Sequence, residues 1–268
     1  MVQLPLVHDS GRQQTVRVTS SSARRQSDAE PVISKDWVRT VRSVLFDFDG
    51  PICSLFAAQD THSIAAQVRK ELAAGGISVE SYLQQTNAHT ILRDVCLTRA
   101  DDFTAPAIGR AGMVLTDFEL ASVATAEPTE HAAALIRLLH SPPLRLSLAV
   151  ASNNSGEAIR AYLHRHDMLR VFEGRIHGRD HGSPALMKPD PSCVRAAVDS
   201  LPECDRENCI LIGDSVFDGE AASKADVTFV GFVPPKAEEP DRHRDRLRRA
   251  GAAFVVMDLS LLVDAFTP

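Results

Sequence analysis

The segment Val44-Leu45-Phe46-Asp47-Phe48-Asp49-Gly50-Pro51 decides how the rest of the chain is interpreted. Its first three residues are apolar without alternation, which is typical of a strand buried on both faces in a parallel sheet. Gly50 and Pro51 are turn formers and predict the end of this strand. Asp47 and Asp49 therefore follow the carboxyl end of a buried strand, where open α/β sheets bind their ligands.

The two carboxylates would repel each other, and burial would raise the free energy of both charges. A bound cation would relieve both effects. The same residues are compatible with a plain strand followed by an acidic turn, so this segment alone leaves both interpretations open.

Two later apolar runs, 146–151 and 209–213, predict further buried strands. Ser152 follows the first of these strands and Asp214 follows the second. Neighbouring strands lie about 4.8 Å apart. If the three strands pair, their carboxyl ends would bring Asp47, Ser152 and Asp214 together at one edge of the sheet.

With these residues in this order, the chain resembles the haloacid dehalogenase superfamily of phosphatases and phosphotransferases, which carries four short motifs. They correspond here to Asp47-Phe48-Asp49-Gly50, Ser152, Lys188 and Gly213-Asp214-Ser215-Val216-Phe217-Asp218. Each motif is weak alone, whereas four in order at the ends of predicted strands form a specific signal. The resemblance extends from about residue 41 to the C-terminus.

The resemblance implies a role for each acidic residue. Asp47 would be the nucleophile that forms an aspartyl-phosphate, and Asp49 would be the general acid and base. Asp47, Asp214 and the backbone carbonyl of Asp49 would bind Mg²⁺, which prefers oxygen ligands. Family members with carbon–halogen or phosphonate chemistry typically lack an acid at the position of Asp49, so its presence favours phosphate esters.

The resemblance also implies that Ser152, Asn153 and Lys188 bind the phosphoryl group, together with the positive end of a helix that begins near residue 155. Lys188 would pair with Asp47 as a fixed cation. Helix capping is the alternative for Ser152, and a plain loop charge is the alternative for Lys188. Asn153 is also a candidate for steadying the loop of the second aspartate.

Asp218, Gly50 and Ser215 would support the site. Asp218 would orient Lys188 or a metal-bound water, and capping of the following helix by Ser215 or Asp218 is the alternative. One departure from the family is Pro51, which replaces the usual threonine. Without that hydroxyl, the positioning of the second aspartate is in question.

The chain divides into three parts on sequence grounds. Residues 1–38 are rich in Ser, Arg and Gln without periodicity and predict a flexible arm. Residues 39–54 and 128–268 alternate between strand and helix patterns, which predicts an α/β core, a doubly wound parallel sheet of Rossmann-like type. Residues 55–127 predict an inserted α-helical cap, at the place where phosphoglycolate phosphatases and β-phosphoglucomutases carry one. A separate helical domain without a catalytic task is the alternative.

Within the insertion, Asp60 is expected to cap a helix that Gly75 and Gly76 end. The two glycines are also candidates for substrate selection, because they permit backbone shapes that are closed to other residues. Pro128 is expected to start the next core helix, since proline is favoured in a first turn. Further helices of the insertion are expected at 78–85, 87–99 and 111–126.

The composition narrows the class of protein. The chain has 268 residues and a net charge of −6, which argues against nucleic-acid binding, because that function usually needs a basic face. No apolar run approaches the roughly 20 residues that span a membrane. The histidines show no metal-binding spacing. The five cysteines are scattered without a CxxC pair, which favours reduced thiols in a cytoplasmic protein; they are Cys53, Cys96, Cys193, Cys204 and Cys209.

Together these observations predict a Mg²⁺-dependent phosphatase that hydrolyses a small phosphorylated metabolite through an aspartyl-phosphate. Two alternatives stay open. A phosphomutase would pass the phosphoryl group to a sugar phosphate, and a catalytically silent protein would use the same cleft for binding. The sequence specifies neither the substrate nor the oligomeric state.

Overall fold

The computed structural model describes residues 33–172, 174–202 and 206–268. Most of the predicted arm, residues 1–32, and Cys204 lie outside this description. The predicted boundary of the arm at residue 38 is too late, because helix α1 (Lys35–Thr40) begins before it. The hydroxyl of Ser34 caps this helix by accepting a hydrogen bond from the Asp36 amide at 3.2 Å.

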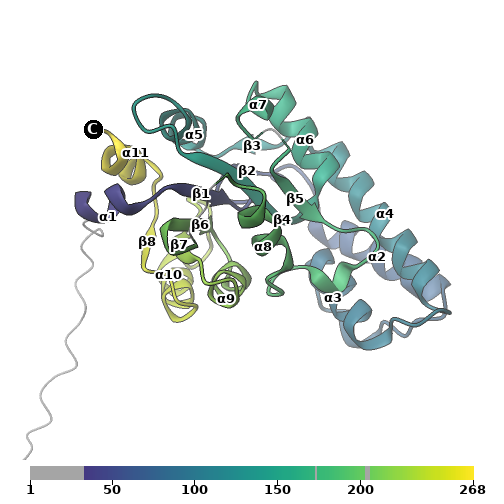
Figure 1. Ribbon diagram of the computed structural model, residues 1–268. Helices are drawn as coiled ribbons and strands as arrows, with labels where there is room; N and C mark the ends of the chain where they lie inside the picture. Colours follow the sequence, from purple (N-terminus) through teal and green to yellow (C-terminus); the bar gives the residue numbers. More distant parts are fainter. Residues whose placement is uncertain (1–32, 173, 203–205) are drawn as a thin grey trace, which may run out of the picture. The chain divides into compact units, whose positions relative to one another are not determined.

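The described residues form a six-stranded sheet in the order β5-β4-β1-β6-β7-β8, and all its neighbouring strands are parallel (Figure 1). The strands are β1 (Ser43–Phe46), β4 (Ser147–Ser155), β5 (Ile176–Arg179), β6 (Cys209–Gly213), β7 (Thr228–Phe232) and β8 (Phe254–Val256). Strand β1 lies between β4 and β6, with Phe46 opposite Val150 and Ile212. The three strands that carry the predicted site are therefore neighbours.

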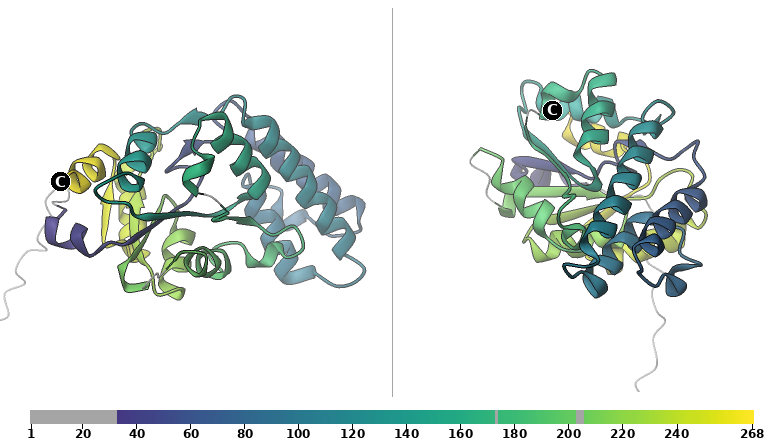
Figure 2. Two further views of the ribbon diagram at one scale, coloured as in Figure 1. Left: turned by 45° about the horizontal axis from the view of Figure 1, so that its top comes forward. Right: turned by 90° about the vertical axis from the view of Figure 1, so that its right-hand side faces the viewer.

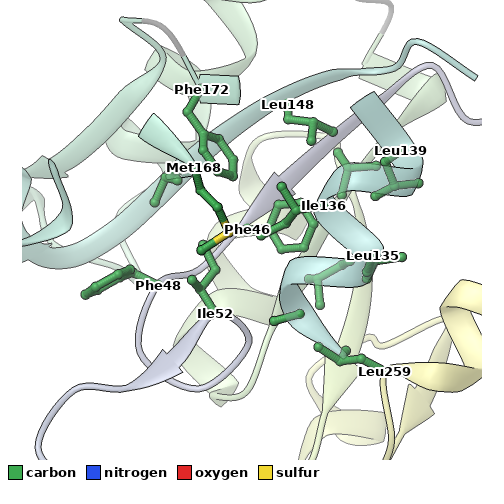
Figure 3. Close-up of a cluster of buried hydrophobic side chains, with 14 of the residues drawn as sticks. Phe46, Phe48, Ile52, Leu135, Ile136, Leu139, Leu148, Met168, Phe172 and Leu259 are labelled. Carbon is green, nitrogen blue, oxygen red and sulfur yellow. The ribbon is translucent and has the colours of Figure 1, made fainter. Parts of the chain in front are cut away.

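Helices cover both faces of the sheet. On one face lie α1, α5 (Ala132–His140), α6 (Gly156–Arg165), α7 (Leu169–Phe172) and α11 (Ser260–Phe266). On the other lie α8 (Ser192–Asp199), α9 (Val216–Lys224) and α10 (Pro240–Arg249). Because side chains alternate along a strand, Val44 and Phe46 pack under the first group and Leu45 under the second. Figure 3 shows Phe46 among side chains of the first group. The predicted doubly wound α/β fold is confirmed.

Two details of the sheet differ from expectation. Strand β5 was not predicted, because Ile176-His177-Gly178-Arg179 contains a single large apolar residue. Strand β4 does not end before Ser152 but continues to Ser155, with an irregular register against β5 between Ala151 and Ser155. Ser152 and Asn153, which were predicted to bind phosphate, are therefore part of the strand itself.

Residues 55–127 leave and rejoin the sheet domain through two short strands, β2 (Cys53–Ser54) and β3 (Glu127–Pro128), which pair antiparallel. Between them lie α2 (Thr61–Ala74), α3 (Ala88–Arg99) and α4 (Ala105–Ser122), grouped beyond one end of the sheet (Figures 1 and 2). These helices share an apolar cluster of their own, to which Met187 of the sheet domain contributes.

The prediction that Pro128 begins a helix is wrong. Pro128 lies in β3 opposite Cys53, and α5 begins at Ala132. Proline cannot donate a ladder hydrogen bond, and a two-residue edge strand tolerates this. The Thr129 amide instead donates to the Ile52 carbonyl at 3.1 Å, which extends the pairing past the proline.

The helices of the insertion follow the predicted order with changed bounds. Asp60 caps α2 as expected, and Gly75 follows its last residue. The stretch predicted at 78–85 contains only a 3-10 turn at Glu80–Tyr82, and α4 begins at Ala105, before the predicted start at residue 111. Two other 3-10 turns lie at Pro184–Leu186 and Arg206–Asn208.

No helix in the described part of the chain combines the length and apolar character needed to cross a membrane. No disulfide joins the described cysteines, which are Cys53, Cys96, Cys193 and Cys209. The cytoplasmic location stays a prediction.

Candidate functional site

One cavity of about 220 Å³ lies at the carboxyl ends of β1, β4 and β6. Its lining includes seven of the residues singled out in the sequence: Asp47, Asp49, Ser152, Asn153, Lys188, Asp214 and Ser215. Asp47 follows the last residue of β1, and its amide donates to the Ile212 carbonyl of β6 at 2.8 Å. The pairing of the strands thus fixes the position of Asp47.

Lys188 is the cation at the centre of this site and is only 1% exposed. Its Nζ lies 3.0 Å from Oδ1 of Asp47, donates to the Ala151 carbonyl at 2.9 Å, and donates to Oδ1 of Asp218. An ammonium group has three protons, and three acceptors surround this one. Burial alone would lower the pKa of Lys188, but the carboxylates of Asp218 and Asp47 outweigh it and raise the pKa. Lys188 lies in a turn, but its ammonium group is buried and paired, so it is not a plain loop charge.

Asp218 both contacts Lys188 and caps the following helix, which were alternatives in the sequence analysis. Its Oδ1 accepts from Lys188. Its Oδ2 accepts from the Ser215 amide at 2.9 Å and from the Ser215 hydroxyl at 2.6 Å. In return, the Asp218 amide donates to the Ser215 hydroxyl at 3.2 Å, which completes a capping box at the start of α9. The helix cap therefore holds the carboxylate that positions the lysine.

Asp49 is held by a backbone group. Its Oδ1 accepts a hydrogen bond from the Leu55 amide at 2.8 Å. The pKa of Asp49 is raised to about 6, because burial and the charge of Asp47 outweigh the lowering effect of the Leu55 hydrogen bond. The threonine that Pro51 replaces has a partial counterpart, because the Thr129 hydroxyl donates to the Gly50 carbonyl at 2.6 Å in the same turn.

Gly50 allows Asp214 to approach this turn. Its φ is +107°, a conformation that residues with a Cβ rarely adopt. A Cβ at this position would lie 2.6 Å from Cγ of Asp214. The glycine therefore brings the end of β1 and the third acidic residue into contact.

The acidic residues of the site carry more negative charge than its cation offsets. Burial raises the pKa of Asp47, against the lowering effect of Lys188. Burial likewise raises the pKa of Asp214 well above its usual range, and the charges of Asp218, Asp47 and Asp49 add to the effect. Four carboxylates that share one ammonium group would be stabilised by a further cation.

A divalent metal ion fits this arrangement. Carboxylate oxygens of Asp47, Asp214 and Asp218 lie within 4.8 Å of one another. Asp218 is already bound to Lys188 and Ser215. Asp47 and Asp214 are therefore the side chains available to a metal, and Mg²⁺ typically takes one or two carboxylates in addition to water and phosphate oxygens.

Asn153 differs from its predicted role in the second aspartate's loop. Its Oδ1 accepts from the Lys188 amide at 2.7 Å, and its Nδ2 donates to the Lys188 carbonyl at 3.1 Å. It thus fixes the backbone of the lysine. A contribution of Asn153 to phosphate binding stays a prediction, as do the chemical roles of the other site residues.

The N-terminal part of α3 contributes Asn87, His89, Thr90 and Arg93 to the lining of the cavity. Arg93 donates to Asp94 and to the Lys188 carbonyl, and its guanidinium lies 4.5 Å from the ring centre of Phe217. The sequence analysis placed none of these residues in the site. The first turns of this helix have an ordinary composition, which does not indicate that they line a cavity.

A second cavity of about 320 Å³ borders Asp49, Asn87 and His89, which also line the first. The rest of its lining comes from the chain leading into the insertion and from the insertion itself: Ser54, Phe56, Thr61, Ile64, Thr86, Ala88 and Leu115. No lysine or arginine is among these residues. The second cavity begins at Asp49, on the insertion's side of the site.

A buried ion pair beside these cavities was also missed. Glu119 of α4 and Arg179 at the end of β5 have no exposed side-chain surface, and their nearest atoms lie 2.7 Å apart. Burial alone would raise the pKa of Glu119, but the His89 hydrogen bond and the Arg179 charge outweigh it and lower the pKa to about 2. Thr116 and Glu119 have capping-box spacing in the sequence, and both lie inside α4. A charged residue among apolar helical positions was the only available signal.

Three solved structures illustrate the similarity of the fold. A hydrolase from Pseudomonas syringae has 21% identity and a TM-score of 0.60, covering 85% of this chain and 100% of its own. A predicted phosphatase from Clostridium acetobutylicum has 20% identity and a TM-score of 0.60, with coverages of 84% and 97%. A hydrolase from Deinococcus radiodurans, solved with bound phosphate and sodium, has 22% identity and a TM-score of 0.54, with coverages of 84% and 96%.

The search among curated proteins returned no match. A family model described as haloacid dehalogenase-like hydrolase matches residues 41–226. This segment contains all four motifs and spans well over half of the chain. The earlier resemblance is therefore confirmed, and the chain belongs to the haloacid dehalogenase-like hydrolases.

Proposed function

We propose that this protein is a Mg²⁺-dependent phosphatase that hydrolyses the phosphate ester of a small metabolite. The observation that carries the proposal is the position of Asp47, fixed at the end of β1 against Lys188 and facing a cavity with Asp49 and Asp214. Similar folds in a predicted phosphatase and in a hydrolase with bound phosphate support it.

Asp47 would be the nucleophile. The Phe48 amide donates to its Oδ1 at 2.7 Å, and Lys188 contacts the same oxygen. The other carboxylate oxygen, Oδ2, would be the attacking atom. In the first step Oδ2 would form a bond to phosphorus as the ester P–O bond breaks, giving an aspartyl-phosphate. In the second step water would attack that phosphorus and restore the free carboxylate.

Asp49 would move the protons in both steps. A general acid needs a pKa near the working pH, and the pKa of about 6 allows Asp49 to hold a proton in a substantial fraction of molecules. It would give this proton to the leaving oxygen and then take one from the attacking water. The Leu55 amide would keep its carboxylate in place during both transfers.

Mg²⁺ would be held by Asp47, Asp214 and the backbone carbonyl of Asp49. When bound, it would offset negative charge on the carboxylates and on the phosphoryl oxygens. Ser152 and Lys188 would bind and orient the phosphoryl group from the other side. Phosphoryl transfer depends mainly on such positioning and charge compensation.

We further propose that residues 55–127 act as a cap that holds the leaving group. The second cavity begins at Asp49, which would protonate the leaving oxygen, so the organic part of the substrate would extend into it. A volume of about 320 Å³ lies at the lower end of the range for small-molecule pockets. A small metabolite therefore fits better than a macromolecule.

The proposal is tested by measuring phosphate release from a panel of phosphorylated metabolites with Mg²⁺ present. Hydrolysis of at least one small phosphate ester is expected, with loss on chelation and recovery on addition of Mg²⁺. Ca²⁺ should support turnover poorly, because its larger and looser coordination shell would change the geometry at Asp47. Isomerisation without phosphate release would identify a phosphomutase, and full turnover in metal-free buffer would contradict the metal requirement.

A further inference from the structure

Glu119 belongs to the insertion, yet several of its hydrogen-bond partners belong to the sheet domain. Its Oε2 accepts from the Ser155 amide at 2.9 Å and from Nη2 of Arg179 at 3.0 Å. Its Oε1 accepts from Nη1 of Arg179 at 2.7 Å and from Nδ2 of Asn154 at 3.3 Å. The carboxylate therefore lies against the last residues of β4, which follow the phosphate-binding Ser152.

The same Oε1 also lies 2.7 Å from Nε2 of His89. Because Oε1 can only accept, Nε2 must be the protonated nitrogen of the ring. His89 lines both cavities, so Glu119 orients one of the side chains that a substrate would meet. Five donors converge on this carboxylate. A neutral amide could not replace it, since it has one oxygen and brings two protons of its own.

A short chain of hydrogen bonds connects Glu119 to the phosphate-binding serine. Asn154 donates through Nδ2 to Glu119, and its Oδ1 accepts from the Ser152 hydroxyl at 3.1 Å. The two bonds fix which way the amide of Asn154 faces. In this position the amide oxygen competes with the carboxylate of Asp47 for the single proton of the Ser152 hydroxyl, and so biases its orientation. Arg179 adds a second link by donating to the Asn153 carbonyl at 2.9 Å.

We propose that Glu119 is a positioning residue that makes phosphate binding at β4 depend on the docked insertion. Through Asn154 it would orient Ser152, and through His89 it would shape the wall of the leaving-group cavity. The phosphate-binding end of β4 is thus completed by a side chain from another part of the fold. This inference rests on the proposed function, because it assigns phosphate binding to Ser152.

The test compares Glu119→Gln with wild type in two measurements on folded protein. One is the inhibition constant of inorganic phosphate, and the other is the separation of kcat from KM for a hydrolysed ester. Both the phosphate affinity and kcat should fall by about 10- to 100-fold, as for other residues that orient ligand-binding groups. Glu71→Gln is the matched control, because Glu71 pairs with Arg110 at 3.9 Å within the insertion and does not line either cavity. Its phosphate affinity and kcat should equal those of wild type.

Asn154→Ala tests the path to Ser152 while leaving the pair of Glu119 and Arg179 in place. It should weaken phosphate binding by itself. In the double variant with Glu119→Gln, the loss should be no larger than the larger single loss, because both substitutions break the same chain. Should Glu119→Gln fail to fold, wild-type phosphate affinity in Asn154→Ala would overturn the inference.

A merely structural role for Glu119 would lower the melting temperature and leave the phosphate inhibition constant and kcat of folded molecules unchanged. That result would also overturn the inference. A failure of the proposed function is distinguishable, since wild type would then release no phosphate from any ester. Phosphate binding could still be compared by calorimetry, where a weaker affinity of Glu119→Gln would support the positioning role alone.

Discussion

Two buried clusters of charge lie close together in this protein and differ in their balance. At the end of β1, the carboxylates of Asp47, Asp49, Asp214 and Asp218 lie near one ammonium group, that of Lys188, and only Asp47 and Asp218 contact it. Burial raises the pKa of Asp47, Asp49 and Asp214. At the junction with the insertion, Glu119 faces Arg179 and His89, and its pKa falls to about 2. Most charged residues of both clusters are buried, with Asp49, Asp214 and His89 partly exposed, so the number of compensating partners makes the difference.

The number of compensating partners decides whether a buried carboxylate is reactive or stabilises the fold. A carboxylate with a full set of donors is stabilised as an anion and is a poor base and a poor nucleophile. A carboxylate that lacks compensation can bind a metal, accept a proton or attack phosphorus. We therefore expect acid-to-amide substitutions to have opposite effects on the stability of the folded protein in the two clusters. The following predictions run from the largest effect to the smallest.

Asp47→Asn should abolish turnover, with a loss of roughly 10⁴-fold or more, as expected for the removal of a nucleophile. Its melting temperature without metal should equal or exceed that of wild type, because the substitution removes charge from an over-negative cluster. Phosphate release and thermal unfolding measure the two properties. Near wild-type turnover would show that Asp47 is not the nucleophile, and a large loss of stability would contradict the comparison.

Asp49→Asn should reduce turnover of alkyl phosphates by about 10²- to 10⁴-fold, the usual contribution of general acid–base catalysis. The loss should be smaller for para-nitrophenyl phosphate, whose leaving group departs without a proton. Trapped aspartyl-phosphate should accumulate in this variant, because activation of water fails as well. Equal losses on both substrate types, with no trapped intermediate, would assign Asp49 to the metal loop only.

The stability contributed by Glu119 should depend on acid pH. Its pKa in the folded protein, about 2, lies below the ordinary value of 4.5. The contribution is therefore complete above pH 4.5 and is lost as the pH falls towards 2. Urea unfolding at several pH values should show wild type losing its advantage over Glu119→Gln across this range. A constant difference between the two proteins would contradict the pKa argument.

Gly75→Ala should destabilise the insertion without changing the chemistry in either cluster. A Cβ at Gly75 would lie 2.1 Å from the Cβ of Ala107, and overpacking of this kind costs about 1–3 kcal/mol. Gly109→Ala in α4 is the matched control, because its Cβ would meet no atom within 4 Å and alanine favours a helix. Thermal unfolding should show a loss for the first and none for the second.

The ranking of substrates should be the same in both glycine variants. Gly75 and Gly76 were candidates for substrate selection in the sequence, but neither lines the two cavities beside Asp49. A changed ranking in Gly75→Ala would restore that earlier hypothesis.

The sequence allowed the central fold and the main site to be predicted because their signals are local. Strands β1 and β6 are short apolar runs and β4 begins with one, and each run leads into its polar residues within a few positions. Strand β5 lacks such a run and was missed. Arg179 at its end was missed with it, although its partner Glu119 lies sixty positions earlier. Two residues that far apart in the sequence form no local motif from which their pairing could be predicted.

The role of Pro51 depends on contacts that only the folded chain provides. The missing hydroxyl suggested a poorly positioned Asp49. In the structure, the Leu55 amide donates to that carboxylate. Thr129, which follows the insertion in the sequence, donates to the Gly50 carbonyl and so stabilises the turn. Thr129 lies 79 positions from Gly50, so its contribution required knowledge of how the chain returns to the sheet.

Gly50 has a consequence for how this protein could evolve. Any side chain there would collide with Asp214 and would meet an unfavourable φ. The neighbouring turn, by contrast, is fastened by backbone groups and by Thr129, none of which needs a particular side chain at Pro51. Substitutions at position 50 should therefore be selected against during evolution, whereas substitutions at position 51 should be tolerated. In a library that randomises both codons and selects for activity, survivors should vary at the second and retain glycine at the first.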